Sequence, residues 1–358
     1  MDARWQLGIT HLPRSIMQVS FWAFVAAQWK RQPPVVEADL TGKTVIVLGA
    51  NIGLGFETAK HFATMNPGRL ILACRSQSKG QAAVEKIKAD TGFAKAELWI
   101  VDLADFASVK QFADKFDREG GRLDILVENA AVAVLDYEST KDGWETTLQV
   151  ANLSTPLVAF RLLPAMIQTA RDHSTLPRLV VVSSETHQRV DIEKGVLEST
   201  GIIQTLGSAE HCSSKDGMKG RYPLSKLLNI FFARALNEHL PPSTPLVVNT
   251  VNPGYCYSGL RRHFSGIRAV VSRLMELCLA FSTEVGSRQF VYAALGEPDH
   301  PDKLRGAYIS GTRVQEVSDF VLSPQGVKAQ GRLWDELVEI LGSVDTKVPD
   351  IVQKYLLP

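Results

Sequence analysis

The fold of this chain is decided by the stretch Val45-Ile46-Val47-Leu48-Gly49-Ala50-Asn51-Ile52-Gly53-Leu54-Gly55. Its four leading apolar residues predict a buried strand, and the apolar pattern that follows predicts a helix over residues 53–65. The glycines between them let the backbone approach a pyrophosphate at the positive end of that helix. The stretch therefore predicts the first βαβ unit of a dinucleotide-binding sheet. Its expected cofactor contacts are Gly49, Asn51, Ile52, Gly53, Leu54 and Gly55.

Further strands are predicted over residues 69–73, 96–101, 123–127 and 178–182, alternating with helical segments. We expect one α/β domain over residues 41–358: a Rossmann-type, doubly wound parallel sheet of about seven strands with helices on both faces. Polar or small residues follow two of the strands, where a ligand of such a sheet lies. The adenosine end of a dinucleotide is expected to meet Asp102, Leu103, Asn129 and Ala130. Taken singly, Asp102 and Asn129 are also typical turn-forming residues.

The predicted strand over residues 69–73 is followed by Cys74-Arg75-Ser76, with Lys79 one turn further on. A site specific for NAD usually places an acidic residue here to hold the ribose hydroxyls, whereas an arginine accommodates a 2′-phosphate. Arg75 and Lys79 therefore favour NADP(H) over NAD(H). The alternative is that Arg75 is a solvated residue at a strand end.

A second informative stretch, Tyr222-Pro-Leu-Ser-Lys226, sets a phenol and an ammonium four residues apart on one helix face. A fixed cation stabilises the phenolate and lowers the tyrosine pKa, so the pair predicts an acid-base catalyst. Tyr137-Glu-Ser-Thr-Lys141 has the same spacing. It lies in a polar stretch typical of a loop, whereas Tyr222 opens a helical apolar pattern. We therefore expect the pair Tyr222 and Lys226 to be the functional one.

The bulk composition narrows the class of protein further. The hydrophobic content is 45% and the formal net charge is +1, which gives no electrostatic reason to expect nucleic acid as a partner. The four cysteines and eight histidines show no metal-ligand spacing, so we expect neither a disulfide framework nor a metal. A reducing, cytoplasmic location fits best.

The first 40 residues form an N-terminal extension with a short apolar run over residues 16–27, followed by Lys30-Arg31 and Pro33-Pro34. The run is shorter than the roughly 20 residues that cross a bilayer. Two alternatives remain: an interfacial helix on an intracellular membrane, and a helix that packs on the domain or covers the substrate pocket.

Taken in order, these motifs resemble the short-chain dehydrogenase/reductase family over residues 41 to about 340. The motifs are the glycine turn at 49–55, Asp102, Asn129-Ala130, Ser184, Tyr222-x-x-x-Lys226, and Asn252-Pro253-Gly254 followed by Ser258. Ser183-Ser184-Glu185-Thr186-His187 is similar to the retinol-dehydrogenase-like and WW-domain-oxidoreductase-like branch, whose relatives are common in fungal secondary-metabolite pathways. The resemblance implies that Ser184 hydrogen-bonds the substrate oxygen and that Pro253, Gly254 and Ser258 hold the nicotinamide. It also implies a carbonyl reductase or alcohol dehydrogenase.

The chain departs from the family at several positions near the expected site. The family's relay asparagine aligns with Ala151, one residue before Asn152, and a local helical bulge would be needed to bring Asn152 into that role. Leu48, Glu128 and Ala131 also replace the family's usual residues. These changes leave two alternatives open: a non-redox isomerase, dehydratase or cyclase using the same pair, and a cofactor-binding protein with weak catalysis.

Two long segments, residues 185–221 and 258–282, are expected on the substrate side. The second carries Leu274, Leu277 and Leu279, which either line an apolar pocket or pack in the core or lid. We expect a hydrophobic small-molecule substrate. A late helix with Leu333 and Leu337 is expected to close the substrate side or form a subunit contact, which leaves an oligomer open.

Overall fold

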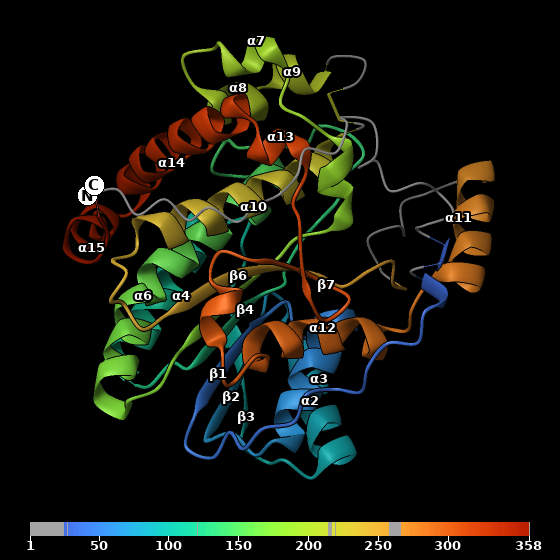
Figure 1. The fold of residues 1–358 in the computed structure, drawn as a ribbon, viewed down its shortest axis with the longest axis vertical. Helices are drawn as coiled ribbons and strands as arrows, with labels where there is room; N and C mark the ends of the chain where they lie inside the picture. The colour runs from blue at the N-terminus through green and yellow to red at the C-terminus, as the bar shows by residue number, and fades with distance from the viewer. Residues whose placement is uncertain are drawn as a thin grey trace.

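The computed structural model describes residues 25–26, 28–119, 121–213, 217–218, 220–257 and 266–357. They contain a sheet of eight strands in the order β3-β2-β1-β4-β5-β6-β7-β8 (Figure 1). All neighbouring strands pair parallel except β7 and β8. The expected parallel sheet of about seven strands is confirmed, and a two-residue antiparallel edge strand is added to it.

The strands are β1 (Thr44–Leu48), β2 (Arg69–Cys74), β3 (Ala96–Ile100), β4 (Ile125–Glu128), β5 (Arg178–Val182), β6 (Val247–Asn252), β7 (Tyr308–Ser310) and β8 (Val314–Gln315). The longer helices are α2 (Gly53–Thr64), α3 (Gln77–Thr91), α4 (Phe106–Glu119), α6 (Thr155–His173), α10 (Arg221–His239), α11 (Gly266–Leu279), α12 (Thr283–Leu295), α14 (Pro324–Val344) and α15 (Lys347–Tyr355). The five predicted strands and the first predicted helix begin and end within two residues of these bounds.

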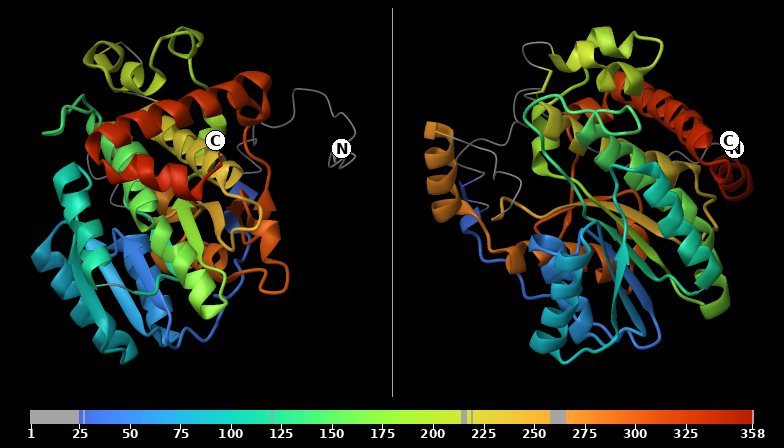
Figure 2. Two further views of the ribbon diagram at one scale, coloured as in Figure 1. Left: turned by 90° about the vertical axis from the view of Figure 1, so that its left-hand side faces the viewer. Right: turned by 180° about the vertical axis from the view of Figure 1, so that it is seen from behind.

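Helices cover both faces of the sheet (Figures 1 and 2). Along β1, Val45 and Val47 belong to the core shared with α2, α3 and α12, while Ile46 and Leu48 belong to the core shared with α4, α6 and α10. All five residues of β1 are buried because each face is covered. The continuous apolar run in the sequence follows from this arrangement.

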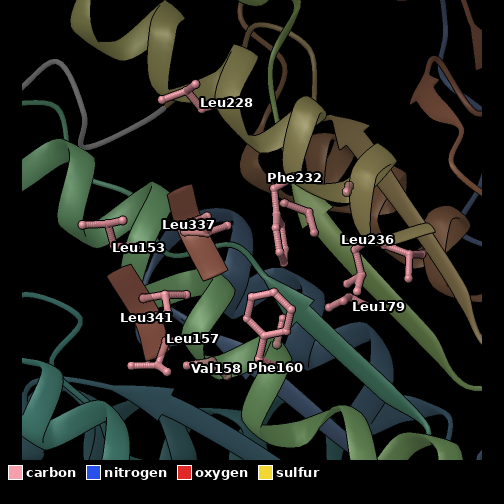
Figure 3. Packing of buried hydrophobic residues seen from close by; sticks show 14 of the residues in the cluster. Leu153, Leu157, Val158, Phe160, Leu179, Leu228, Phe232, Leu236, Leu337 and Leu341 are labelled. Atoms are coloured by element: carbon pink, nitrogen blue, oxygen red, sulfur yellow. The ribbon is translucent and has the colours of Figure 1, made fainter. Parts of the chain in front are cut away.

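Helix α10, which carries Tyr222 and Lys226, is held between α6 and α14. Figure 3 shows Phe232 of α10 above Phe160 of α6, and Leu236 of α10 beside Leu179 of β5. Phe160 contacts the Phe232 ring edge-on, with ring centroids 5.9 Å apart. Leu333 and Leu337 of α14 are buried in this same core and support α10.

The first expected substrate segment contains four short helices: η2 (Glu185–Arg189), α7 (Lys194–Leu197), α8 (Ile202–Gly207) and α9 (Ala209–Ser213). Helices α7, α8 and α9 lie over one end of α14 (Figure 1), whereas η2 packs against α10. The Glu336 carboxylate of α14 accepts hydrogen bonds from the backbone N–H groups of Ile203 and Gln204, at 2.9 and 3.0 Å. Its carboxylate thus supplies the acceptors that the first turn of α8 requires.

The second expected substrate segment contains α11, which projects from the domain beside the first described residues of the chain (Figures 1 and 2). Gln28 Nε2 donates to the carbonyl oxygens of Tyr255 and Leu279, at 2.8 and 2.9 Å. Leu279 is buried, but Leu274 and Leu277 are 58% and 69% exposed. These two leucines therefore neither line a pocket nor pack in the core.

The helical run Thr146–His173 is the one span among the described residues long and apolar enough to cross a membrane. It comprises α5 (Thr146–Leu148), the π-helix η1 (Gln149–Ser154) and α6. Of its apolar window, 89% is buried inside the protein, so it is a core helix, and it packs on one face of the sheet.

Candidate active site

The glycine turn joins β1 to α2 as the sequence predicts. Gly49 has a φ of +73°, which favours glycine, and its N–H donates to Ala73 O at 2.7 Å. Ile52 is the N-cap of α2 and makes no side-chain cap, so side-chain capping does not occupy the amides of the first turn. This helix end therefore has the free N–H donors and positive end that a pyrophosphate needs.

Asn129 fixes the shape of this turn. Its Nδ2 donates to the carbonyl oxygens of Leu48 and Gly49, at 3.0 and 3.2 Å. A Cβ on Gly55 would lie 2.4 Å from Gly49 O and 2.5 Å from Asn129 Nδ2, so only glycine fits there. Asn129 thus acts on the cofactor loop through the backbone, a role that the sequence analysis did not assign to it.

Arg75 and Lys79 are exposed beyond the carboxyl end of β2. Neither forms an ion pair with any other described residue, so both cations remain available to an anion. Ser76 caps α3 by accepting a hydrogen bond from the Lys79 N–H at 3.4 Å. Since Gly49 is bonded to Ala73, both cations stand next to the glycine turn.

Asp102 follows β3, at the predicted edge of the sheet. Its Oδ1 accepts from the Ala104 N–H at 2.9 Å, and its own N–H donates to Ser108 Oγ at 2.9 Å. Leu103 is buried beside it, while Ala130 is partly buried against the core. The turn-forming interpretation of Asp102 therefore describes its bonds in this structure, and its contact with adenosine stays a prediction.

Ser184 and Tyr222 come from the end of β5 and the first turn of α10. Ser183 is buried, and its Oγ donates to Lys226 O at 2.8 Å, which commits it to the scaffold. Ser184 is only half-buried, and its Oγ accepts from the Thr186 N–H at 3.3 Å. Of the two serines, Ser184 is therefore the one whose hydroxyl hydrogen remains available to a substrate oxygen.

Lys226 is buried beneath the half-buried Tyr222, with its Nζ 5.5 Å from the centre of the phenol ring. Its Nζ donates to Val182 O at 3.0 Å. Burial lowers the pKa of Lys226 to about 8, so its ammonium is charged at neutral pH and loses that charge under mildly alkaline conditions. The predicted phenol and cation are thus adjacent, with a charge that depends on pH.

Asn152 reaches α10 through the π-helix η1, whose wider turn is the local bulge that the sequence analysis required. Its Nδ2 donates to Ser225 O at 2.9 Å and to Asn229 Oδ1 at 2.7 Å. Asn229 Nδ2 then donates to Val182 O at 3.0 Å, the same oxygen that accepts from Lys226. Asn229 was missed, although its position three residues after Lys226 places both side chains on one helix face.

Two buried acids lie near these groups. Glu145 is paired with Arg221, the residue directly before Tyr222. Arg221 Nε lies 2.6 Å from Glu145 Oε2. Glu128, at the end of β4, is also buried, and neither of its carboxyl oxygens has a hydrogen-bond partner among the described residues. Burial raises the pKa of Glu128 well above its usual range, because desolvation disfavours the charged carboxylate.

The predicted nicotinamide loop follows β6. Asn252 Oδ1 accepts from the Gly254 N–H at 3.1 Å, and Asn252 Nδ2 donates to Ser310 Oγ of β7 at 3.1 Å. Pro253 and Gly254 are half-buried at the same sheet edge as Ser184. Ser258 lies outside the described residues.

In the second pair with catalytic spacing, Tyr137 is half-buried and Lys141 is exposed. Lys141 forms an ion pair with Asp105 and is exposed, which agrees with its interpretation as a loop residue. Among the described residues, no cluster of three or more His, Cys, Asp or Glu side chains is arranged to hold a metal ion.

Comparison with known proteins agrees with this geometry. Residues 43–193 match the family model described as short chain dehydrogenase. The chain is 36% identical to the short-chain dehydrogenase anuD of Penicillium roqueforti, over 91% of this chain and 84% of that one. It is 34% identical to the short chain dehydrogenase/reductase dmxR8 of a Cryptosporiopsis species, over 90% and 97% of the two chains.

Solved structures share the fold. An uncharacterised protein from Mycobacterium paratuberculosis superposes with a TM-score of 0.61 and 26% identity, covering 86% of this chain and 98% of that one. A short chain dehydrogenase from Burkholderia cenocepacia, solved in complex with NADP, gives a TM-score of 0.56 at 22% identity, covering 76% and 97%. The expected resemblance is confirmed: this chain belongs to the short-chain dehydrogenase/reductase family of NAD(P)(H)-linked oxidoreductases.

Proposed function

We propose that this protein is an NADP(H)-dependent oxidoreductase that interconverts a carbonyl and an alcohol on a hydrophobic small molecule. In this proposal it is a ketone or aldehyde reductase of a metabolite pathway. The observation that carries the proposal is the position of Lys226 under the Tyr222 ring. Lys226 Nζ is bonded to Val182 O at the end of β5, two residues before Ser184. An acid with a buried cation beside it suits proton transfer to an alkoxide.

Each residue has a distinct part in the reductive direction. Ser184 Oγ donates a hydrogen bond to the carbonyl oxygen and orients it. Bound NADPH supplies the hydride for the carbonyl carbon. Tyr222 gives its proton to the developing alkoxide, and the Lys226 ammonium stabilises the phenolate that remains. In the oxidative direction Tyr222 is the base.

The preference for NADP(H) rests on Arg75 and Lys79, whose charges are not neutralised by any described residue. A guanidinium beyond β2 suits the 2′-phosphate, and an acidic residue that would hold the ribose hydroxyls is missing from this position. The related structures from Burkholderia cenocepacia and Pseudomonas aeruginosa contain NADP, which supports the same choice.

The direct test is NADPH oxidation, followed by its absorbance, with a panel of apolar ketones, aldehydes and quinones. We expect turnover in the wild type and a fall of about 10³-fold in Tyr222→Phe. Tyr137→Phe is the matched control, because it removes the same hydroxyl from the other pair of this spacing and should retain full activity. Equal activity in all three proteins would refute the role of Tyr222.

The second candidate function is non-redox chemistry by the same pair, as an isomerase, dehydratase or cyclase, and the third is cofactor binding with weak catalysis. The unpartnered Glu128 at the end of β4 favours keeping both. Tight NADPH binding without carbonyl turnover would favour these two. Product formation without cofactor turnover then separates the second from the third.

We further propose a cytoplasmic protein that rests on the surface of an intracellular membrane. Trp29 is 71% exposed beside the exposed Leu274 and Leu277 of α11, and Lys30 and Arg31 follow directly. Apolar side chains flanked by cations are typical of interfacial contacts. Residues 16–24 and 27 of the predicted apolar run lie outside the described residues. Co-sedimentation with vesicles of 30% phosphatidylserine tests the proposal, and Leu274→Glu/Leu277→Glu should abolish it.

A further inference from the structure

A buried histidine lies next to the proposed substrate-binding serine. His187 has no exposed surface, and its Nδ1 lies 2.7 Å from the carbonyl oxygen of Ser184. On the opposite side of the ring, the backbone N–H of Ser318 donates to Nε2 at 3.2 Å. The ring therefore connects the end of β5 to a segment more than 130 residues further along the chain.

These two bonds fix the tautomer of the ring. A backbone N–H can only donate, so Nε2 must carry no hydrogen. Nδ1 then carries the hydrogen and donates it to Ser184 O, which leaves the imidazole neutral. Tyr308 of β7 contacts the ring edge-on, with centroids 4.8 Å apart and planes at 70°, so packing also restricts its orientation.

Ser184 is thereby held at two atoms. His187 bonds its carbonyl oxygen, while the Thr186 N–H bonds its Oγ. Ser318 is the N-cap of α13 (Asp319–Leu322), which precedes α14, the helix whose Glu336 accepts the first N–H groups of α8. His187 thus lies between Ser184 and the helices α13 and α14, and α14 in turn supports α8 on the expected substrate side.

We propose that His187 is a positioning residue that holds Ser184 in register with Tyr222 and links this register to the C-terminal segment through Ser318. The proposal rests on the proposed carbonyl chemistry, in which Ser184 orients the substrate oxygen. A displacement of about 1 Å at such a group can lower a rate about 100-fold. His187 itself touches neither substrate nor cofactor.

The neutral ring also predicts a pH dependence. Burial lowers the pKa of His187 below its usual value, and protonation would place Nε2–H against the Ser318 N–H, donor against donor. The ionisable groups on the elements around it are Glu185 and Arg189 of η2, Arg221, Tyr222, Lys226, Arg234, Glu238 and His239 of α10, Tyr308 of β7 and Asp319 of α13. Since the folded state favours the neutral ring, the bond to Ser318 is intact at neutral pH and is lost as the pH falls through the lowered pKa.

The test compares variants that keep or remove the two bonds. Gln offers one N–H donor and one carbonyl acceptor, so His187→Gln should retain kcat within about threefold and lose the acid limb of the pH profile that the imidazole causes. His187→Phe should lower kcat by 10- to 100-fold with the Kd for NADPH unchanged. Equal kcat for the Gln and Phe variants, or a loss confined to NADPH binding, would overturn the proposal.

Ser318 gives the second, matched comparison. Its φ is −61°, which a proline ring accepts, so Ser318→Pro removes the N–H while Ser318→Ala removes only the hydroxyl cap. We expect Ser318→Pro to lower kcat about tenfold below Ser318→Ala. Combined with His187→Phe it should have no further effect, because both changes break one connection. Additive losses would show two independent effects and refute the link.

The two hydrogen bonds of the His187 ring can also be measured in the absence of any reaction. A failure of the proposed reaction is therefore distinguishable from a failure of this inference. Imidazole ¹⁵N shifts, assigned with His187→Gln, should show the neutral Nδ1–H form in the wild type at pH 7. Ser318→Pro should change them and Ser318→Ala should not. An Nε2–H or a charged ring would overturn the inference whatever substrate the enzyme uses.

Discussion

The two halves of the site are built from different parts of the polypeptide. On the nucleotide side, the turn after β1 presents backbone N–H groups, is fixed by Asn129 and is flanked by the exposed Arg75. On the catalytic side, buried polar side chains from distant segments bond one another, as Asn152 does with Asn229. A site made of backbone depends on the space that glycines leave, whereas a site made of buried side chains depends on each partner being matched.

The largest effect should come from the catalytic half. Lys226→Met removes the cation and should lower the rate of carbonyl reduction by about 10³-fold. Wild-type reduction should likewise decline above pH 8, where Lys226 loses its charge. Steady-state rates from pH 6 to 10 check both expectations, and a flat alkaline profile would contradict them.

The same substitution should stabilise the protein. The folded pKa of Lys226, about 8, lies below its ordinary 10.5, so its stability contribution is present above pH 10.5 and lost as the pH falls through 8. At pH 7 the buried charge is therefore a cost, and we expect Lys226→Met to raise the free energy of unfolding by about 1–3 kcal/mol without nucleotide. Urea unfolding at pH 7 measures this. A destabilised variant would show that the bond to Val182 O outweighs desolvation.

In the nucleotide half the sharpest change is steric. Gly55→Ala places a methyl group 2.4 Å from Gly49 O, so the turn must move away from its observed shape. We expect the Kd for NADPH to rise about 30-fold, measured by calorimetry, because the backbone donors no longer converge. Gly195→Ala, where nothing lies within 4 Å of the added carbon, is the control. Unchanged NADPH binding in Gly55→Ala would show that the observed shape of this backbone turn is not needed to bind the cofactor.

A smaller effect is expected from charge at the same edge. Arg75→Ala should weaken NADPH binding about tenfold and leave NADH binding unchanged, since only NADPH carries the 2′-phosphate. Fluorescence titration with both cofactors provides the comparison. An equal loss for the two would mean that Arg75 acts on the fold of the turn and not on the phosphate.

The smallest effect concerns Glu128, which lies between the halves. Its folded pKa is raised, so its stability contribution is complete below pH 4.5 and is lost as the pH rises through the folded value. Glu128→Gln should therefore match the wild type in free energy of unfolding at pH 4 and exceed it at pH 8. Unfolding curves at the two pH values test this, and a constant difference would exclude ionisation as the cause.

The sequence predicts the nucleotide half better than the catalytic half for a physical reason. Strand β1 and its glycine turn are contiguous, so periodicity and glycine spacing suffice to place them. Bonds such as Asn152 to Asn229 join residues 77 positions apart, and no local pattern encodes them. The exposed Leu274 and Leu277 show a second limit of the sequence. Their apolar pattern is local, but it does not tell whether another part of the protein covers these side chains.

Val182 O accepts hydrogen bonds from both Lys226 and Asn229, which bond α10 to the end of β5. Residues 190–213, which carry α7, α8 and α9, can therefore be exchanged between members of the family without changing the bonds that hold α10. A chimaera that takes residues 190–213 from a relative should recognise a different substrate while the proton donor keeps its place. Such enzymes would then diversify by replacing this segment while the catalytic scaffold stays the same.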